Sequence, residues 1–209
     1  MYLCVTPKNN EIFRDLSFSK SYISDCLEIV FENAMIINPI NAFWLRSFAD
    51  FRFAQEKHAD ALTLYMEACL VCSESFTRSF PDNVVDDILW RKIQQCLRKL
   101  GMVTLAAAVS QLLRMPYDNH LTNAKALLDS HGDTFDACTA YFPLINDINL
   151  IEFMNDVYEK LRLHRKSNLL LNSLAVPEMN AHNITHLERF RRGERLLLIL
   201  CSQIFCIYL

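Results

Sequence analysis

The sequence predicts an all-α fold in which antiparallel helix pairs stack into an array. Three glycines and six prolines in 209 residues leave little material for the tight turns that β-hairpins need. Apolar residues recur at spacings of three and four along most of the chain, which is the period of an amphipathic helix. A hydrophobic content of 52% is enough to fill an interior between such helices.

The segment 42–73 carries the clearest pattern and predicts two helices folded back on each other at residues 55–57. An apolar stripe runs along each helix, and small alanines alternate there with bulky residues. The stripes consist of Leu45, Phe48, Ala49 and Phe53 on the first helix and of Ala61, Leu64, Tyr65 and Ala68 on the second. This order of large and small residues resembles a tetratricopeptide repeat, a helix pair with a period of roughly 34 residues. A plain helical hairpin with an alanine-lined contact is the alternative.

Further helices are predicted directly before and after this pair. One spans 18–37 and is stopped by Asn38 and Pro39, because the residue before a proline is pushed out of the helical region. The second helix of the pair is expected to run on to Arg78, before Pro81 breaks the chain.

The next helix, over 84–100, is predicted to have an apolar face opposite a basic one. Asp82 or Asn83 is expected to cap its N-terminus, and Gly101 follows a basic last turn as C-terminal cap. The apolar positions are Val85, Ile88, Leu89, Ile93, Cys96, Leu97 and Leu100, and the outward ones are Arg91, Lys92, Arg98 and Lys99.

The second half of the chain continues the helical pattern. The alanine-rich segment 102–115 is nearly uncharged and is expected to be the most buried helix, closed by Pro116. Other helices are predicted over 119–128, 134–142, 148–164, 167–174 and 184–205. Some nine or ten helices joined by short loops favour a stacked array. We predict two parts: an N-terminal helix with its lead-in over 1–40, and the array with an apolar C-terminal helix over 41–209.

No residue set in the sequence predicts catalysis or a bound cofactor. Three glycines cannot form a G-x-S-x-G, Walker-type or G-x-G-x-x-G motif. Cys69 and Cys72 have the spacing of a metal or redox pair, but no second pair completes four zinc ligands, and both lie mid-helix, where a thiolate is not stabilised. His182 and His186 are spaced to share one helix face, but they lack the glutamate that follows the first histidine in a metalloprotease.

Two carboxylate pairs, Asp86 with Asp87 and Asp133 with Asp136, fall in the first turns of predicted helices. Negative charge is favoured there by the helix dipole, so capping accounts for both pairs. We therefore predict no catalytic residue, no cofactor-binding residue, no metal ligand and no enzymatic activity.

The cysteines and the N-terminus favour a reducing compartment. Most of the eight cysteines occupy apolar positions of helices, where a free thiol behaves as a small hydrophobe. Residues 1–10 lack the basic and then apolar run of a secretory signal.

Two basic clusters and an apolar tail are the remaining candidates for binding. The clusters span 160–166 and 189–195 and are either solvated faces or sites that dock on an acidic partner or an RNA backbone. A net charge of −3 gives no general affinity for nucleic acid. The tail 196–209 is shorter than the about 20 apolar residues that cross a bilayer, so a helix that seals the array is favoured over a membrane anchor.

Several separate blocks of sequence agree in order and separation with one known family. They are CSESFTRSFP (72–81), IQQC (93–96), AAVSQLLR (107–114), IEFM (151–154), EMNAHN (178–183) and the ending 191–205. Together they resemble the C-terminal region of the Integrator complex subunit 8 family over about residues 42–205. Because family members are much longer, the resemblance implies a C-terminal fragment or a short gene product.

The resemblance implies a non-catalytic scaffold subunit in a nuclear assembly. That assembly acts with RNA polymerase II, processes small nuclear RNA 3′ ends and recruits protein phosphatase 2A. The expected partners are therefore other Integrator subunits, with the phosphatase reached only through the complex, and neither direct nucleic-acid binding nor a membrane is expected. The alternatives are an RNA-contacting helical domain that uses 160–166 and 189–195, and a tail-anchored membrane adaptor.

Overall fold

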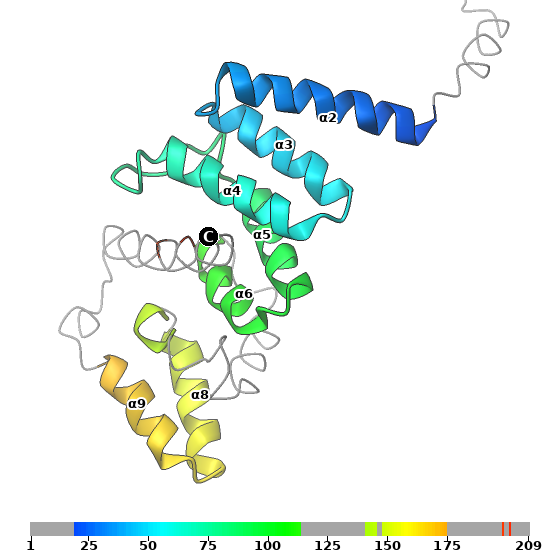
Figure 1. Ribbon diagram of the computed structural model, residues 1–209. Coiled ribbons are helices and arrows are strands. Elements are labelled where there is room, and N and C mark those ends of the chain that lie inside the picture. The colour runs from blue at the N-terminus through cyan, green and yellow to red at the C-terminus, as the bar shows by residue number, and fades with distance from the viewer. Residues whose placement is uncertain (1–18, 114–140, 146–147, 175–197, 199–200, 202–209) are drawn as a thin grey trace, which may run out of the picture. The chain divides into compact units, whose positions relative to one another are not determined.

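The computed structural model describes residues 19–113, 141–145, 148–174, 198 and 201, and all regular structure in this part of the chain is helical (Figure 1). The predicted all-α class is confirmed. The chain divides into two compact units, Met1–Ile40 and Asn41–Leu209. The helices predicted over 119–128 and 184–205, and residues 134–140 of the one predicted over 134–142, lie outside the described residues apart from Leu198 and Cys201.

Helix α2 belongs to the first unit and spans Lys20–Ile37. It confirms the described part of the helix predicted over 18–37, and the Asn38 N–H closes it by donating to the Ala34 carbonyl at 2.9 Å. None of the α2 side chains that the structure describes is buried. The exposed large apolar residues of α2 are Tyr22, Ile23, Leu27, Ile29, Val30, Ile36 and Ile37.

Helices α3 (Ala42–Ala54) and α4 (His58–Cys72) form the predicted antiparallel pair. The Asn41 side chain caps α3 by accepting from the N–H groups of Phe43 and Trp44, and Glu56, at φ 62°, makes the turn. Six of the eight predicted contact residues are buried, namely Leu45, Phe48, Ala49, Ala61, Tyr65 and Ala68. Phe53 and Leu64 are half-buried against the same core. The predicted pair and its turn at 55–57 are confirmed.

The prediction that the second helix runs on to Arg78 is wrong, because α4 ends at Cys72. The Ser73 hydroxyl donates to the Cys69 carbonyl at 2.6 Å and accepts from the Phe76 N–H at 2.9 Å. A side chain that bonds to nearby backbone in this way competes with helix continuation. Three residues then adopt positive φ, namely Glu74, Ser75 and Phe76.

Helix α5 spans Asp87–Lys99, and its N-terminal cap is Asp86. The predicted caps Asp82 and Asn83 are wrong, because the N–H groups of Val84 and Val85 donate to the Pro81 carbonyl and close a turn before the helix starts. Asp86 and Asp87 do serve the N-terminus of the helix, as predicted.

The end of α5 is also as predicted. Gly101 has a φ of 81°, and the Met102 N–H donates to the Leu97 carbonyl at 2.9 Å. This is the Schellman arrangement, in which a left-handed residue after the helix satisfies its last carbonyls.

Several residues of the segment 84–100 differ from the prediction. Ile88 is 59% exposed, because it falls on the helix face opposite the buried stripe. Leu100 is exposed at the C-cap position. Lys92, predicted to point outward, is half-buried. Trp90 and Gln94 are buried on the packed face instead.

Helix α6 (Val103–Val109) is buried along nearly its whole length, and a 3-10 turn, η1 (Ser110–Leu112), follows it. Residues 104–110 are all buried, which confirms the expectation of a deeply buried helix. The predicted end near Met115 is too late, because the Ser110 hydroxyl donates to the Ala107 carbonyl at 2.6 Å where the backbone tightens. Pro116 lies outside the described residues.

The helix predicted over 148–164 ends earlier, and a hairpin takes its place. Helix α8 spans Ile148–Lys160 and α9 spans His164–Leu174. Arg162 adopts a φ of 57°, and the Leu163 N–H donates to the Tyr158 carbonyl at 2.8 Å. The chain therefore makes a Schellman ending without glycine, which the sequence did not indicate.

Two clusters of buried side chains form the core of the second unit. The first gathers residues of α3, α4, α5 and α6 together with Tyr141, Leu144 and Cys201. The second gathers residues of α8, Leu170 of α9 and the 3-10 turn η4 (Phe142–Leu144) region. Helix α6 contributes Ala106 and Ala108 to the first cluster and Ala107 to the second, so one helix is shared between them.

Candidate functional site

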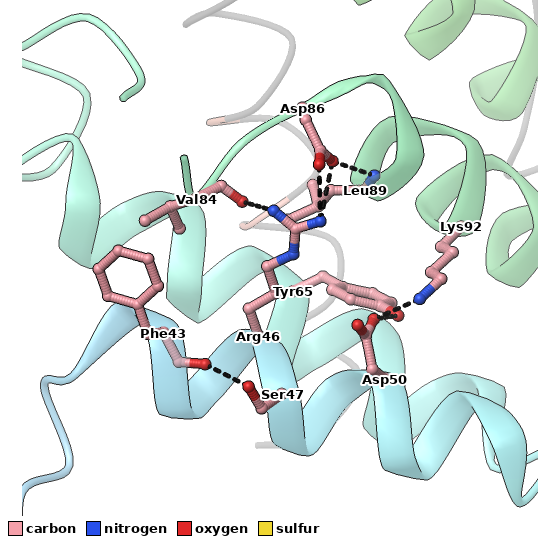
Figure 2. Close-up of polar contacts among 9 residues, drawn as sticks. All are labelled: Phe43, Arg46, Ser47, Asp50, Tyr65, Val84, Asp86, Leu89 and Lys92. Atoms are coloured by element: carbon pink, nitrogen blue, oxygen red, sulfur yellow. Dashed lines mark hydrogen bonds and ion pairs between the residues drawn. The ribbon is translucent and has the colours of Figure 1, made fainter. Parts of the chain in front are cut away.

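Arg46 of α3 joins this helix to the start of α5 (Figure 2). Its Nη1 donates to the Val84 carbonyl at 2.6 Å, and its Nη2 lies 2.9 and 2.8 Å from the two carboxylate oxygens of Asp86. Asp86 Oδ1 also accepts from the Leu89 N–H at 2.9 Å. One carboxylate therefore caps α5 and anchors it to α3.

Asp50 of α3 makes a second connection about one turn further along (Figure 2). Lys92 Nζ of α5 lies 2.7 Å from Asp50 Oδ1, and the hydroxyl of Tyr65 on α4 donates to the same oxygen. Lys92 Nζ also lies 5.9 Å from the centre of the Phe53 ring, within the range of a cation–π contact. We call these connected residues the polar bridge: Arg46, Asp50, Tyr65, Val84, Asp86 and Lys92.

Two groups of the polar bridge, Asp86 and Tyr65, have shifted pKa values. Partial burial favours a higher pKa for Asp86, but hydrogen bonds from Arg46 and from the Leu89 N–H, with the Arg46 charge, outweigh it and lower the pKa. Burial raises the pKa of Tyr65, and its hydrogen bond to Asp50 raises it further. Asp86 is thus an anion and Tyr65 a neutral phenol near pH 7. Neither has the pKa of a group that exchanges protons during catalysis at this pH, so the bridge fixes the relative positions of α3, α4 and α5.

The two contributions of Asp86 can be separated by comparing two substitutions. Asp86→Ala removes both the cap and the ion pair, whereas Asp86→Ser removes the ion pair and retains an oxygen that can accept from Leu89. We expect Asp86→Ala to lower the free energy of unfolding by about 1 kcal/mol more than Asp86→Ser, because that is the typical contribution of an N-terminal cap. Urea unfolding followed by circular dichroism measures the difference. Equal losses would show that the cap contributes nothing.

Cys69 and Cys72, which have metal or redox spacing, have the environment of structural thiols. Cys69 is fully buried in the first cluster, and burial raises its pKa well above the ordinary value. Burial raises the pKa of Cys72 to about 11 and that of Cys96 to about 12. A thiol with a raised pKa is a poor nucleophile and a poor metal ligand at neutral pH. In the described part of the chain, no three His, Cys, Asp or Glu side chains are grouped so that they could hold a metal ion.

We expect thiol alkylation to follow this difference in burial. Iodoacetamide should modify Cys26, which is exposed, in the native chain at neutral pH. Cys69 and Cys96 should react only after denaturant is added, because both are fully buried. Mass spectrometry of the digested chain gives the modification of each cysteine. Labelling of native Cys69 as fast as Cys26 would contradict the structural role.

The structure describes only some of the other residues that the sequence suggested as candidates for binding or catalysis. His182, His186, Asp133, Asp136 and the basic cluster 189–195 lie outside the described residues. Within the tail 196–209, Leu198 is exposed and Cys201 is buried in the first cluster. No helix among the described residues is both long enough and apolar enough to span a bilayer.

The basic cluster 160–166 coincides with the turn between α8 and α9. All of its side chains are exposed except that of Lys166, which is half-buried. Lys166 Nζ lies 5.8 Å from the centre of the Tyr158 ring. The cluster is therefore accessible to a partner.

Comparison with known proteins finds one family and several relatives to which the chain is similar. A family model described as "INTS8, TPR repeats" matches residues 2–204. The chain is similar to Integrator complex subunit 8 of Mus musculus and of Homo sapiens, at 29% identity over 164 residues in each case. The Xenopus laevis protein of the same name is 28% identical over 167 residues. These alignments cover 77%, 77% and 78% of this chain but 16% of each relative, so the chain spans about one sixth of their length.

Proposed function

The chain belongs to the INTS8 tetratricopeptide-repeat family, and from this premise we propose that it is a non-catalytic scaffold module of the Integrator complex. The observation that carries the proposal is the family match over 2–204. The relatives bear the name of a subunit of that complex. In this role the chain binds other Integrator subunits through the surfaces of its helices.

The packing of the described helices supports a binding role. Consecutive helices of the second unit contact one another from α3 to α6, and the polar bridge holds α3, α4 and α5 in fixed positions. Arrays of this kind offer extended surfaces that recognise other proteins. In the first unit, α2 exposes a series of apolar side chains along its length, a property typical of a surface that a partner covers.

The same proposal includes a cellular location, a cellular process and a division of the chain into two parts. We propose a nuclear location, a contribution to small nuclear RNA 3′-end processing and to regulation of RNA polymerase II transcription, and contact with protein phosphatase 2A only through the complex. We further propose that residues 41–209 form the repeat array and that 1–40 provide a helix and lead-in to it.

Affinity purification of the tagged 209-residue chain from nuclei tests the proposal. We expect several Integrator subunits to co-purify, because the array would keep its partner surfaces, and to remain bound after nuclease treatment. A tagged repeat protein of similar size and charge from an unrelated family serves as control. Enrichment of Integrator subunits no greater than with this control would refute the scaffold role, and loss on nuclease treatment would favour an RNA-contacting domain.

A further inference from the structure

The turn between α8 and α9 concentrates positive charge and exposed apolar surface in residues 160–166, which we call the basic turn. Four of its seven residues are lysine or arginine, and none is acidic. Leu161 is 62% exposed and Leu163 is 40% exposed, one on each side of Arg162. Exposed apolar side chains surrounded by charged residues are typical of a site where another molecule binds.

The backbone of the basic turn is held in one conformation. Arg162 lies at φ 57°, and its N–H donates to the Glu159 carbonyl at 3.0 Å, while the Leu163 N–H donates to the Tyr158 carbonyl. The Ser167 hydroxyl, which is buried, lies 2.6 Å from Glu159 Oε1 and so fixes the start of α9 against α8. The backbone would therefore need little further ordering on binding, and this favours affinity.

Three of the four lysines and arginines of the basic turn are available to a partner. Lys160, Arg162 and Arg165 form no ion pair with the part of the chain that the structure describes. The carboxylate beside the turn, Glu159, is already in contact with Ser167 and lies 3.6 Å from His164 Nδ1. The basic turn therefore keeps a net positive charge even with Glu159 beside it.

We propose that the basic turn docks on a protein surface in which carboxylates surround an apolar pocket. This inference rests on the proposed scaffold function and locates one of its contacts. Leu161 and Leu163 enter the pocket, and Lys160, Arg162 and Arg165 pair with the carboxylates around it. Protein interfaces commonly combine an apolar core with a polar rim, and the charges that face each other across them are complementary.

Two other classes of partner fit the basic turn less well. Sequence-tolerant binding of single-stranded RNA combines cations with a series of aromatic side chains on which bases stack, whereas this turn presents two leucines and a single aromatic ring, that of His164. An anionic bilayer could accept both leucines and cations, but even a single myristoyl chain binds membranes only marginally. Two leucine side chains offer fewer carbon atoms than that chain.

Photo-crosslinking of the full chain tests the proposal. The photoreactive amino acid p-benzoylphenylalanine replaces Leu161 in one variant and Phe153, an exposed residue of α8 outside the basic turn, in the matched control. After irradiation in nuclear extract, we expect the Leu161 variant to crosslink to a protein peptide that carries aspartate or glutamate beside apolar residues. Adding Arg162→Glu and Arg165→Glu should lower the yield at least tenfold, whereas Arg98→Glu with Lys99→Glu, two exposed positions on α5, should leave it unchanged.

The possible outcomes separate this proposal from the scaffold role. Crosslinks to RNA or lipid, a yield no higher than at Phe153, or no response to charge reversal on the turn would overturn the docking proposal even if Integrator subunits still co-purify. A charge-dependent crosslink to an acidic protein outside the Integrator complex would support the docking surface, while the scaffold role would still be decided by co-purification. Circular dichroism of each variant establishes that the helices are intact.

Discussion

Ala61→Asp is expected to lower the free energy of unfolding by ~3 kcal/mol or more. Ala61 has no exposed surface and belongs to the cluster that also holds Ala49 of α3 and Tyr65 of α4. A carboxylate there would lose its hydration without gaining a cation or a donor. The substitution falls in the first turns of α4, where the helix dipole favours negative charge, but by only about 0.3–1 kcal/mol. The cost of burial therefore exceeds the gain from the dipole.

The same change at an exposed alanine provides the control. Ala54 is the last residue of α3 and is exposed, so Ala54→Asp should cost less than about 1 kcal/mol, the usual size of an unfavourable charge at a helix C-terminus. Thermal and urea unfolding followed by circular dichroism compare both variants with the parent chain. If Ala61→Asp unfolded like the parent, Ala61 could not lie in a close contact between helices.

The α3–α4 pair was predictable because the information that defines it is local. Leu45, Phe48 and Ala49 repeat at helical spacing, and this period alone decides which side of the helix is buried. The end of α5 was predictable for a similar reason, since Gly101 is the residue type that a left-handed conformation favours. In the first case a few neighbouring residues determine which face of the helix is buried, and in the second they determine where the helix ends.

Other helix ends could not be predicted because they depend on residues without a strong local preference. Arg162 adopts the left-handed conformation between α8 and α9, and Glu74, Ser75 and Phe76 do so after α4. Side chains other than glycine visit this region at a cost, which the surrounding structure must offset. After α4, the buried Phe76 packs into the first cluster, and that contact is visible only once the fold is known.

The polar bridge was also beyond sequence analysis. Arg46 and Asp86 are 40 residues apart, and Asp50 and Lys92 are 42 apart. Their meeting depends on how far α5 is shifted along the α3–α4 pair, which no local pattern encodes. No local signal singled out Asp86 as the cap, because Asp82 and Asn83 are equally suitable residue types for that position.

The second large effect on stability is expected in the second cluster of buried side chains, which gathers residues of α8 and α9. Ile151→Ala should lower the free energy of unfolding by about 2–5 kcal/mol, the range for truncating a fully buried isoleucine, because Ile151 has no exposed surface. Phe153→Ala, at an exposed position two residues away on α8, should cost less than about 1 kcal/mol. Urea unfolding followed by far-ultraviolet circular dichroism measures both.

The same Ile151→Ala variant shows whether the two clusters unfold together. Both tryptophans, Trp44 and Trp90, lie in helices of the first cluster, so their fluorescence reports that part alone, whereas circular dichroism reports all the helices. Because α6 places Ala106 and Ala108 in one cluster and Ala107 in the other, loss of the second cluster should expose a helix that the first one needs. We therefore expect fluorescence and circular dichroism to shift to the same lower midpoint, as in a two-state transition. If fluorescence kept the midpoint of the parent chain while circular dichroism fell early, α6 would be able to stay folded on the first cluster alone.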